Sequence, residues 1–274
     1  MATSIVETIT PKKAQEYLDK SGGNRNISKA VVNSYATTMK QGKWLLNGEP
    51  IVFDINDVLL NGHHRLHAVI LSDTPIQSFV TRGVEHEAYV TFDCGRHRTL
   101  GQLIGMQSVK HYNSTASAVQ VVYRLVNNLS MSDSGSAKSA KRTNAELIDF
   151  FNRDRELFIE AGEVGANARN KAPFVEGSVV GGSYYYLVRY GHYDKEYVRA
   201  FFDDLCSLDT SKNPVVNLLR QRLLRDKTSM TRKTPRQISF ALLVKTWNSY
   251  VTGDTVKCLK FNPETDEYPK FILK

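Results

Sequence analysis

The first hundred residues alternate short apolar runs with segments whose apolar positions recur at helical spacing. Residues 27–41 have one apolar face and predict an amphipathic helix. Two apolar runs at 50–54 and 58–60 flank the polar pair Asn56-Asp57 and predict a β-hairpin. Helical spacing resumes after Gly62. Further strands are predicted at 75–82 and 88–93, and a further helix at 100–106.

Beyond residue 111 the spacing is helical almost throughout. The pattern predicts helices at 114–128, 144–161, 182–190, 196–208, 214–226 and 234–251. A small, polar and basic stretch at 132–142 predicts a loop between two of them. We therefore expect an α+β protein of two domains, a small α/β domain at 1–110 and a mostly α-helical domain at 111–274.

Composition narrows the class of protein. The 274 residues are 41% hydrophobic, and no run of apolar residues is long enough to span a bilayer. The first residues lack the apolar core of a secretory signal. The three cysteines, Cys94, Cys206 and Cys258, form no CxxC pair, which argues against a disulfide framework or a structural zinc site. We expect no membrane partner, reduced thiols and a cytoplasmic location, which is the host cytoplasm if a phage encodes the chain.

The net charge of +8 is concentrated in one part of the chain. Residues 212–245 contain nine basic residues and the single acid Asp226, so this basic block carries the whole excess. A localised basic block predicts a phosphate-bearing partner, for which we expect DNA. The alternative is a solvated helix pair. The residues expected to contact DNA lie off the apolar stripes: Arg222, Arg225, Arg232 and Lys233.

The strongest local motif is the run Gly62-His63-His64-Arg65-Leu66-His67-Ala68 after the predicted hairpin. A helix start presents backbone amides and a partial positive charge, and an arginine in the first turn adds a bidentate donor. This pattern predicts an anion site. The alternative is a simple strand-to-helix turn with solvated polar residues.

This run resembles the phosphate motif of the ParB and sulfiredoxin superfamily. Trp44, the segment 47–51 and the segment 93–99 are similar to bacteriophage or mobile-element members with this domain, so that the resemblance covers roughly residues 20–108. It implies a small α/β domain that holds the phosphates of a nucleoside triphosphate, ATP or CTP. By position, the phosphates would be lined by Gly62, His63, His64 and Arg65.

Departures from the family pattern keep an enzymatic alternative open. Where ParB proteins usually have an acid and sulfiredoxins need a cysteine, this chain has His63, which argues against sulfinic acid repair. Glu49 and Asp93 are the candidates for Mg²⁺ binding or general-base work in a phosphotransferase or nuclease. His63 and His67, four residues apart on a helix, are an alternative metal pair.

The preferred hypothesis is a nucleotide-linked DNA-binding or DNA-processing protein. Its expected partners are DNA and a nucleotide, with a homodimer as an alternative to a monomer. The alternative function is a metal-dependent phosphotransferase or nuclease that uses the same motif, and a third possibility is a protein-interaction factor in which the motif is vestigial.

Overall fold

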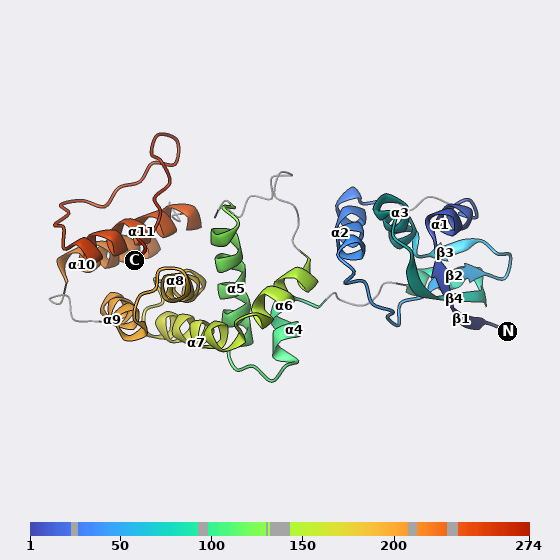
Figure 1. The fold of residues 1–274 in the computed structure, drawn as a ribbon, viewed down its shortest axis with the longest axis horizontal. Coiled ribbons are helices and arrows are strands. Elements are labelled where there is room, and N and C mark those ends of the chain that lie inside the picture. The colour runs from blue at the N-terminus through green and yellow to red at the C-terminus, as the bar shows by residue number, and fades with distance from the viewer. Residues whose placement is uncertain (23–26, 93–97, 130, 132–142, 208–212, 229–234) are drawn as a thin grey trace. The chain divides into compact units, whose positions relative to one another are not determined.

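The computed structural model describes residues 1–22, 27–92, 98–129, 131, 143–207, 213–228 and 235–274 (Figure 1). The chain forms two compact units, Met1–His97 with Ala140–Ala145, and Arg98–Ser139 with Glu146–Lys274. We call them the N-terminal unit and the helical unit. Among the described helices, none combines the length and the apolar character needed to cross a membrane.

The N-terminal unit is a small mixed sheet with helices. Its described elements are β1 (Thr3–Ile9), α1 (Pro11–Leu18), α2 (Lys29–Lys40), β2 (Ile51–Asp54), β3 (Leu59–Asn61), α3 (His63–Ser72), β4 (Ile76–Val84) and the 3₁₀ helix η1 (His86–Thr91). The described strands pair in the order β1-β4-β2-β3, with β2 parallel to β4 and the other pairs antiparallel. The parallel pair requires a crossover, which α3 supplies.

The core of this unit forms where α3 and the sheet bring their apolar residues together. Ile51 and Phe53 of β2, Leu66 and Val69 of α3 and Val80 of β4 are fully or almost fully buried in one cluster. The alternating pattern of β4, with Ile76, Ser78 and Val80 inward, is the period of two that a half-buried strand requires. The core therefore fixes the end of β3 and the start of α3.

The helical unit has the larger core and consists of helices in its described part. These are α4 (Leu100–Gly105), α5 (Tyr112–Val126), α6 (Asn144–Asn152), α7 (Arg155–Lys171), α8 (Gly177–Arg189), α9 (Lys195–Cys206), α10 (Pro214–Thr228) and α11 (Arg236–Thr252). Helices α7 and α8 approach to backbone contact, because a Cβ added at Gly181 would lie 2.5 Å from the carbonyl oxygen of Ala161. Small residues at this crossing allow the close packing.

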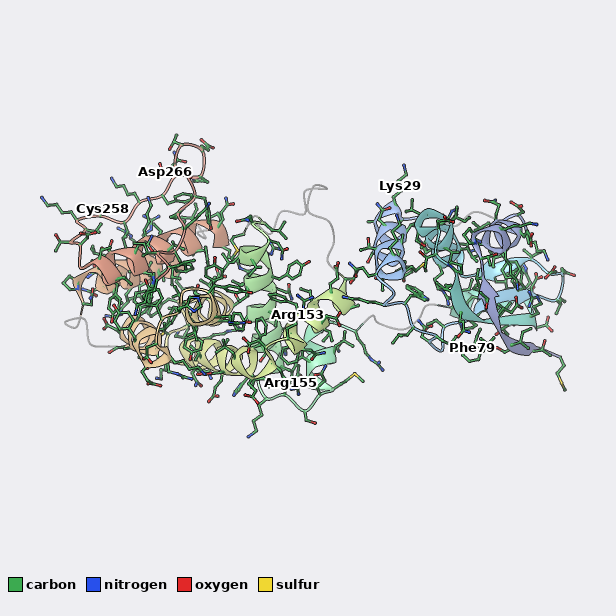
Figure 2. All side chains as sticks on the ribbon, in the orientation of Figure 1. Lys29, Phe79, Arg153, Arg155, Cys258 and Asp266 are labelled. Atoms are coloured by element: carbon green, nitrogen blue, oxygen red, sulfur yellow. The ribbon has the colours of Figure 1, made fainter. Side chains whose placement is uncertain are left out.

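The C-terminal segment 253–274 lies along α11 without regular structure (Figure 1). Phe271 is buried against Phe240 and Tyr186, and Asn248 of α11 hydrogen-bonds to the backbone of residues 270 and 272. Figure 2 labels Cys258 and Asp266 on this segment. Most residues of α11 are accordingly buried or half-buried.

The α+β class, the hairpin and the helix after Gly62 are confirmed. The strand predicted at 88–93 is wrong: the chain turns at Glu85, whose carbonyl accepts the Ala88 N–H at 3.1 Å, and η1 follows. The single helix predicted at 144–161 is two helices, because Asp154 leaves the helical conformation at φ −149°. Figure 2 labels Arg153 and Arg155 on either side of this break.

Neither β1 nor α1 was predicted from the sequence pattern. The two units divide between His97 and Arg98, whereas the sequence pattern placed the boundary near residue 110. Helix α4 belongs to the helical unit because Leu100, Ile104 and Val109 are buried in the helical core.

Candidate functional site

The candidate site begins at Gly62, where β3 passes into α3. Gly62 has φ +112°, a conformation that residues with a Cβ rarely adopt. A Cβ at this position would also lie 3.0 Å from Cγ1 of Ile51. Glycine therefore allows α3 to start directly behind the strand, with the positive end of its dipole at the turn.

Two histidines in the first turn of α3 contact the segment that joins α1 to α2. Nε2 of His63 is 2.9 Å from Oγ of Ser21, and Nε2 of His64 accepts the backbone N–H of Ser28 at 3.1 Å. Residues 23–26 of the same segment lie outside the described residues.

Arg65 is buried and binds the backbone before β2. It is 8% exposed, and its guanidinium donates to the carbonyl oxygens of Glu49 and Pro50, the latter at 2.7 Å. Its planar fork thus fixes the backbone that leads into β2. The sequence motif places Arg65 on phosphate, and the geometry adds a role in holding this backbone.

Of the two candidate acids, Glu49 and Asp93, the structure describes only Glu49. The carbonyl of Glu49 is held by Arg65, the side chain of Glu49 is exposed, and its N–H donates to Oδ1 of Asn47 at 3.0 Å. Asp93 lies outside the described residues. Within the described ranges, no group of three or more His, Cys, Asp or Glu side chains is arranged to hold a metal ion.

An acid–histidine pair in this unit was missed by the sequence analysis. Asp54 at the end of β2 is 2% exposed, its Oδ1 accepts the N–H groups of Asn56 and Val58 at 2.8 Å, and its Oδ2 is 2.7 Å from Nδ1 of His86. The hydrogen bond from His86, together with those from Val58 and Asn56, holds the pKa of Asp54 below its usual value. A local motif could not reveal this pair, because 32 residues separate its members.

Several cationic side chains of the basic block bind other groups of the helical unit. Arg220 is 4% exposed and donates to the carbonyl oxygens of Leu205, at 3.1 Å, and of Asp204. Arg222 pairs with Asp226 at 2.9 Å. Packing and intrahelical pairing therefore reduce the charge that the sequence count assigned to the surface.

The exposed cations of α10 are Arg225 and Lys227. Neither makes an ion pair with another residue of the described chain. Arg232 and Lys233, the other two predicted DNA contacts, lie outside the described residues. Of the four predicted DNA contacts, the structure thus describes Arg222 and Arg225 on α10, and the exposed Lys227 lies on the same helix.

Comparisons with models of protein families, with curated proteins and with solved structures each find no match to this chain. The assignment of function therefore depends on the residues and their geometry.

Proposed function

We propose that the protein is a nucleotide-linked DNA-binding or DNA-processing protein, in which the start of α3 binds the phosphates of a nucleoside triphosphate. The observation that carries this proposal is the start of α3, where Gly62 at φ +112° precedes two histidines in the first helical turn. A helix start of this kind favours an anion through its backbone amides and its dipole.

The four motif residues have two proposed roles, phosphate contact and support of the neighbouring backbone. In this proposal the backbone at Gly62 and the rings of His63 and His64 contact the phosphates. Arg65, which is buried against two carbonyls, keeps the segment before β2 in place beside the phosphates. Its effect on binding is therefore largely indirect.

Glu49 is the described residue that would hold Mg²⁺ in this proposal. Mg²⁺ is typically held by one or two carboxylates together with substrate phosphates and water, and Glu49 offers an exposed carboxylate next to the segment that Arg65 holds. A bound Mg²⁺ would neutralise phosphate charge. Glu49, with Asp93, would be its protein ligand.

The helical unit supplies the DNA contact in this proposal. Arg222, Arg225 and Lys227 on α10 would contact the phosphate backbone, and Arg232 and Lys233, which lie outside the described residues, are the further contacts expected from the sequence. Contacts of this type position a protein on DNA without reading its bases. We therefore expect DNA binding with little sequence preference and a steep dependence on salt.

A second candidate function, phosphotransfer or nuclease activity, is favoured by the pair Asp54–His86. A buried carboxylate that binds Nδ1 of an exposed imidazole orients the ring and favours general-base work at Nε2. Turnover of ATP or CTP, or cleavage of plasmid DNA, that is lost in His86→Ala would select this function. Binding of nucleotide and DNA without turnover would select the binding module.

The nucleotide test compares histidines on the same helix. We expect ATP or CTP to bind in calorimetry with Mg²⁺, and His63→Ala/His64→Ala to weaken binding by roughly tenfold or more, since charge-assisted hydrogen bonds are lost. The matched control is His67→Ala, one turn further along α3, which should bind like the wild type. If neither nucleotide binds the wild type, or if the double variant binds equally well, the proposed phosphate site is wrong.

A further inference from the structure

The helical unit binds a short stretch of its own backbone, residues 270–274, through side chains of α11 and of the connection between α8 and α9. The carboxamide of Asn248 on α11 makes two of these hydrogen bonds: Nδ2 donates to the carbonyl of Lys270 and Oδ1 accepts the N–H of Ile272, both at 2.9 Å. The hydroxyl of Tyr193 donates to the carbonyl of Ile272 at 3.1 Å. Side chains therefore bind this backbone on consecutive peptide groups.

Hydrogen bonds to backbone do not distinguish one sequence from another, because every residue except proline presents the same two groups. Side-chain recognition begins with Phe271, which is buried against Tyr186 of α8 and Phe240 of α11, with ring centroids 5.9 and 5.7 Å away. The next two side chains, Ile272 and Leu273, are 40% and 43% exposed. The aromatic ring is therefore the first determinant of the bound segment.

Lys274 is the second determinant. Its Nζ lies 4.8 Å from the ring centroid of Tyr193 and 6.0 Å from that of Tyr197, where the faces of the tyrosine rings attract a cation. Its backbone N–H donates to the carbonyl of Gly191 at 3.1 Å, which fixes the register of the segment. We call the residues that make these contacts the segment-binding surface: Tyr186, Gly191, Tyr193, Tyr197, Phe240 and Asn248. This surface fits an aromatic residue followed three positions later by a cation.

The chain that leads to this segment has its own contacts with α11. The hydroxyl of Tyr268 donates to the carbonyl of Gln237 at 2.9 Å, and Nζ of Lys245 donates to that of Lys260 at 2.7 Å. Residues 270–274 can therefore leave their surface by a local opening, while the preceding chain stays on α11. Exchange of the whole segment between two copies of the chain would break all these contacts. A foreign segment has to displace residues 270–274 alone, which favours a partner protein over a second copy.

We propose that the segment-binding surface binds a peptide segment of a partner protein in which a basic residue follows an aromatic residue by three positions. Residues 270–274 are its intramolecular competitor. An attached segment has an effective concentration on the order of millimolar, so the partner binds well only when it overcomes this competition. The surface belongs to the helical unit, and the proposal does not depend on phosphate binding at α3.

The first test uses the full chain and a fluorescent peptide of residues 266–274 with an amidated end, whose polarisation reports binding. The surface is occupied in the wild type, so we expect weak binding. Phe271→Ala/Lys274→Ala removes both determinants from the competitor and leaves the surface intact, and it should strengthen peptide binding by about tenfold or more. The matched control is Ile272→Ala/Leu273→Ala, which changes two exposed side chains of the same segment and should bind like the wild type.

Two further variants protect the test against misfolding and locate the binding. Phe271 belongs to the helical core, so Lys274→Glu weakens the competitor without changing that core, and it should also bind the peptide more tightly than the wild type. In the Phe271→Ala/Lys274→Ala background, Asn248→Ala should weaken binding by about fivefold or more, because two hydrogen bonds to the peptide backbone are lost. A peptide with alanine in place of its phenylalanine should bind more weakly to every variant.

Equal peptide binding by the wild type and the weakened variants, or no binding by any of them, would overturn the proposal. Binding that Asn248→Ala leaves unchanged would do the same. Size-exclusion chromatography tests the other occupant. A wild type that forms dimers, which Phe271→Ala converts to monomers, would assign the surface to a second copy and would contradict a partner segment.

Discussion

The N-terminal unit and the helical unit are held together in different ways. In the N-terminal unit, charged side chains fix backbone: Arg65 holds the carbonyls of Glu49 and Pro50, and Asp54 holds the turn that follows β2. In the helical unit, helices pack to backbone contact at Gly181, and Arg124 and Arg236 line a cavity. An arginine in a phosphate-like motif can thus support the backbone, while arginines outside any motif can line a cavity.

This difference predicts which kind of substitution each unit tolerates least. Steric changes should damage the helical unit most, because its helices have no space between them at the α7–α8 crossing. Polar changes should damage the N-terminal unit most, because buried carbonyls lose their donors when an arginine is removed.

The largest effect is expected from Gly181→Ala. Its new Cβ would lie 2.5 Å from the backbone oxygen of Ala161, so α7 and α8 must separate, and the helical unit should lose at least about 3 kcal/mol of stability. Urea unfolding in a Trp44→Phe background, which leaves buried Trp247 as the fluorescent reporter, measures this loss. The control is Gly48→Ala, where the added Cβ meets nothing within 4 Å.

The opposite sign would contradict this account of the crossing. Helix propensity alone predicts that Gly→Ala inside a helix stabilises by up to about 1 kcal/mol. A more stable Gly181→Ala would therefore show that the helices are not in close contact there.

The next largest effect is expected from Arg65→Ala. The carbonyls of Glu49 and Pro50 lose their donors, which should cost the N-terminal unit roughly 2 to 4 kcal/mol. Hydrogen exchange of the β4 amides reports the opening of this unit. Lys29→Ala removes an exposed cation on the outside of α2 (Figure 2) and should stay within about 0.5 kcal/mol of the wild type.

If Arg65→Ala is stable but has lost nucleotide binding, the backbone-supporting role proposed for Arg65 is wrong. Arg65 would then contact the phosphates directly. If Arg65→Ala is unstable but Arg65→Lys restores nucleotide affinity, the positive charge at residue 65 both stabilises the fold and attracts the phosphates.

The smallest effect is expected from Glu7→Gln and depends on pH. Burial raises the pKa of Glu7, but hydrogen bonds from Lys13, Tyr17 and Arg82 outweigh it and lower the pKa from 4.5 to about 2. Because the folded pKa is depressed, the stabilisation is complete above pH 4.5 and is lost as the pH falls towards 2. At pH 7 we expect Glu7→Gln to cost about 1 to 3 kcal/mol.

The pH dependence provides the check. The stability difference between Glu7→Gln and the wild type, measured by hydrogen exchange of β1 and β4, should close between pH 4.5 and 2. Glu16→Gln, which changes an exposed carboxylate on α1, should show little difference at any pH. A gap for Glu7→Gln that is independent of pH would assign the effect to packing.

The predictable parts of this molecule are those encoded over short distances. The hairpin and α3 follow from alternating residues, Gly62 and helical spacing, and most of the later helices follow from their apolar faces. The strand at 88–93 failed because a short apolar run in η1 is indistinguishable from one in a strand.

The unpredictable parts depend on partners distant in the sequence. The sequence placed Arg65 in a phosphate motif and Arg220 in the basic block, yet each guanidinium donates to backbone carbonyls that lie 15 and 16 residues earlier in the chain. His86 becomes a candidate functional residue only because the fold places it 2.7 Å from Asp54. The polar cavity is likewise lined by residues of three helices, α5, α8 and α11. Tertiary packing decides these roles, and residue type alone does not.

The phosphate site at the start of α3 can be tested by titrating the isotopically labelled protein with ATP or CTP and Mg²⁺ and recording amide NMR spectra. We expect the largest shifts at the amides of Gly62, His63 and His64, and a smaller change at His67, one turn away. Shifts confined to other parts of the chain, or no shifts at saturating nucleotide, would contradict a phosphate site at the start of α3.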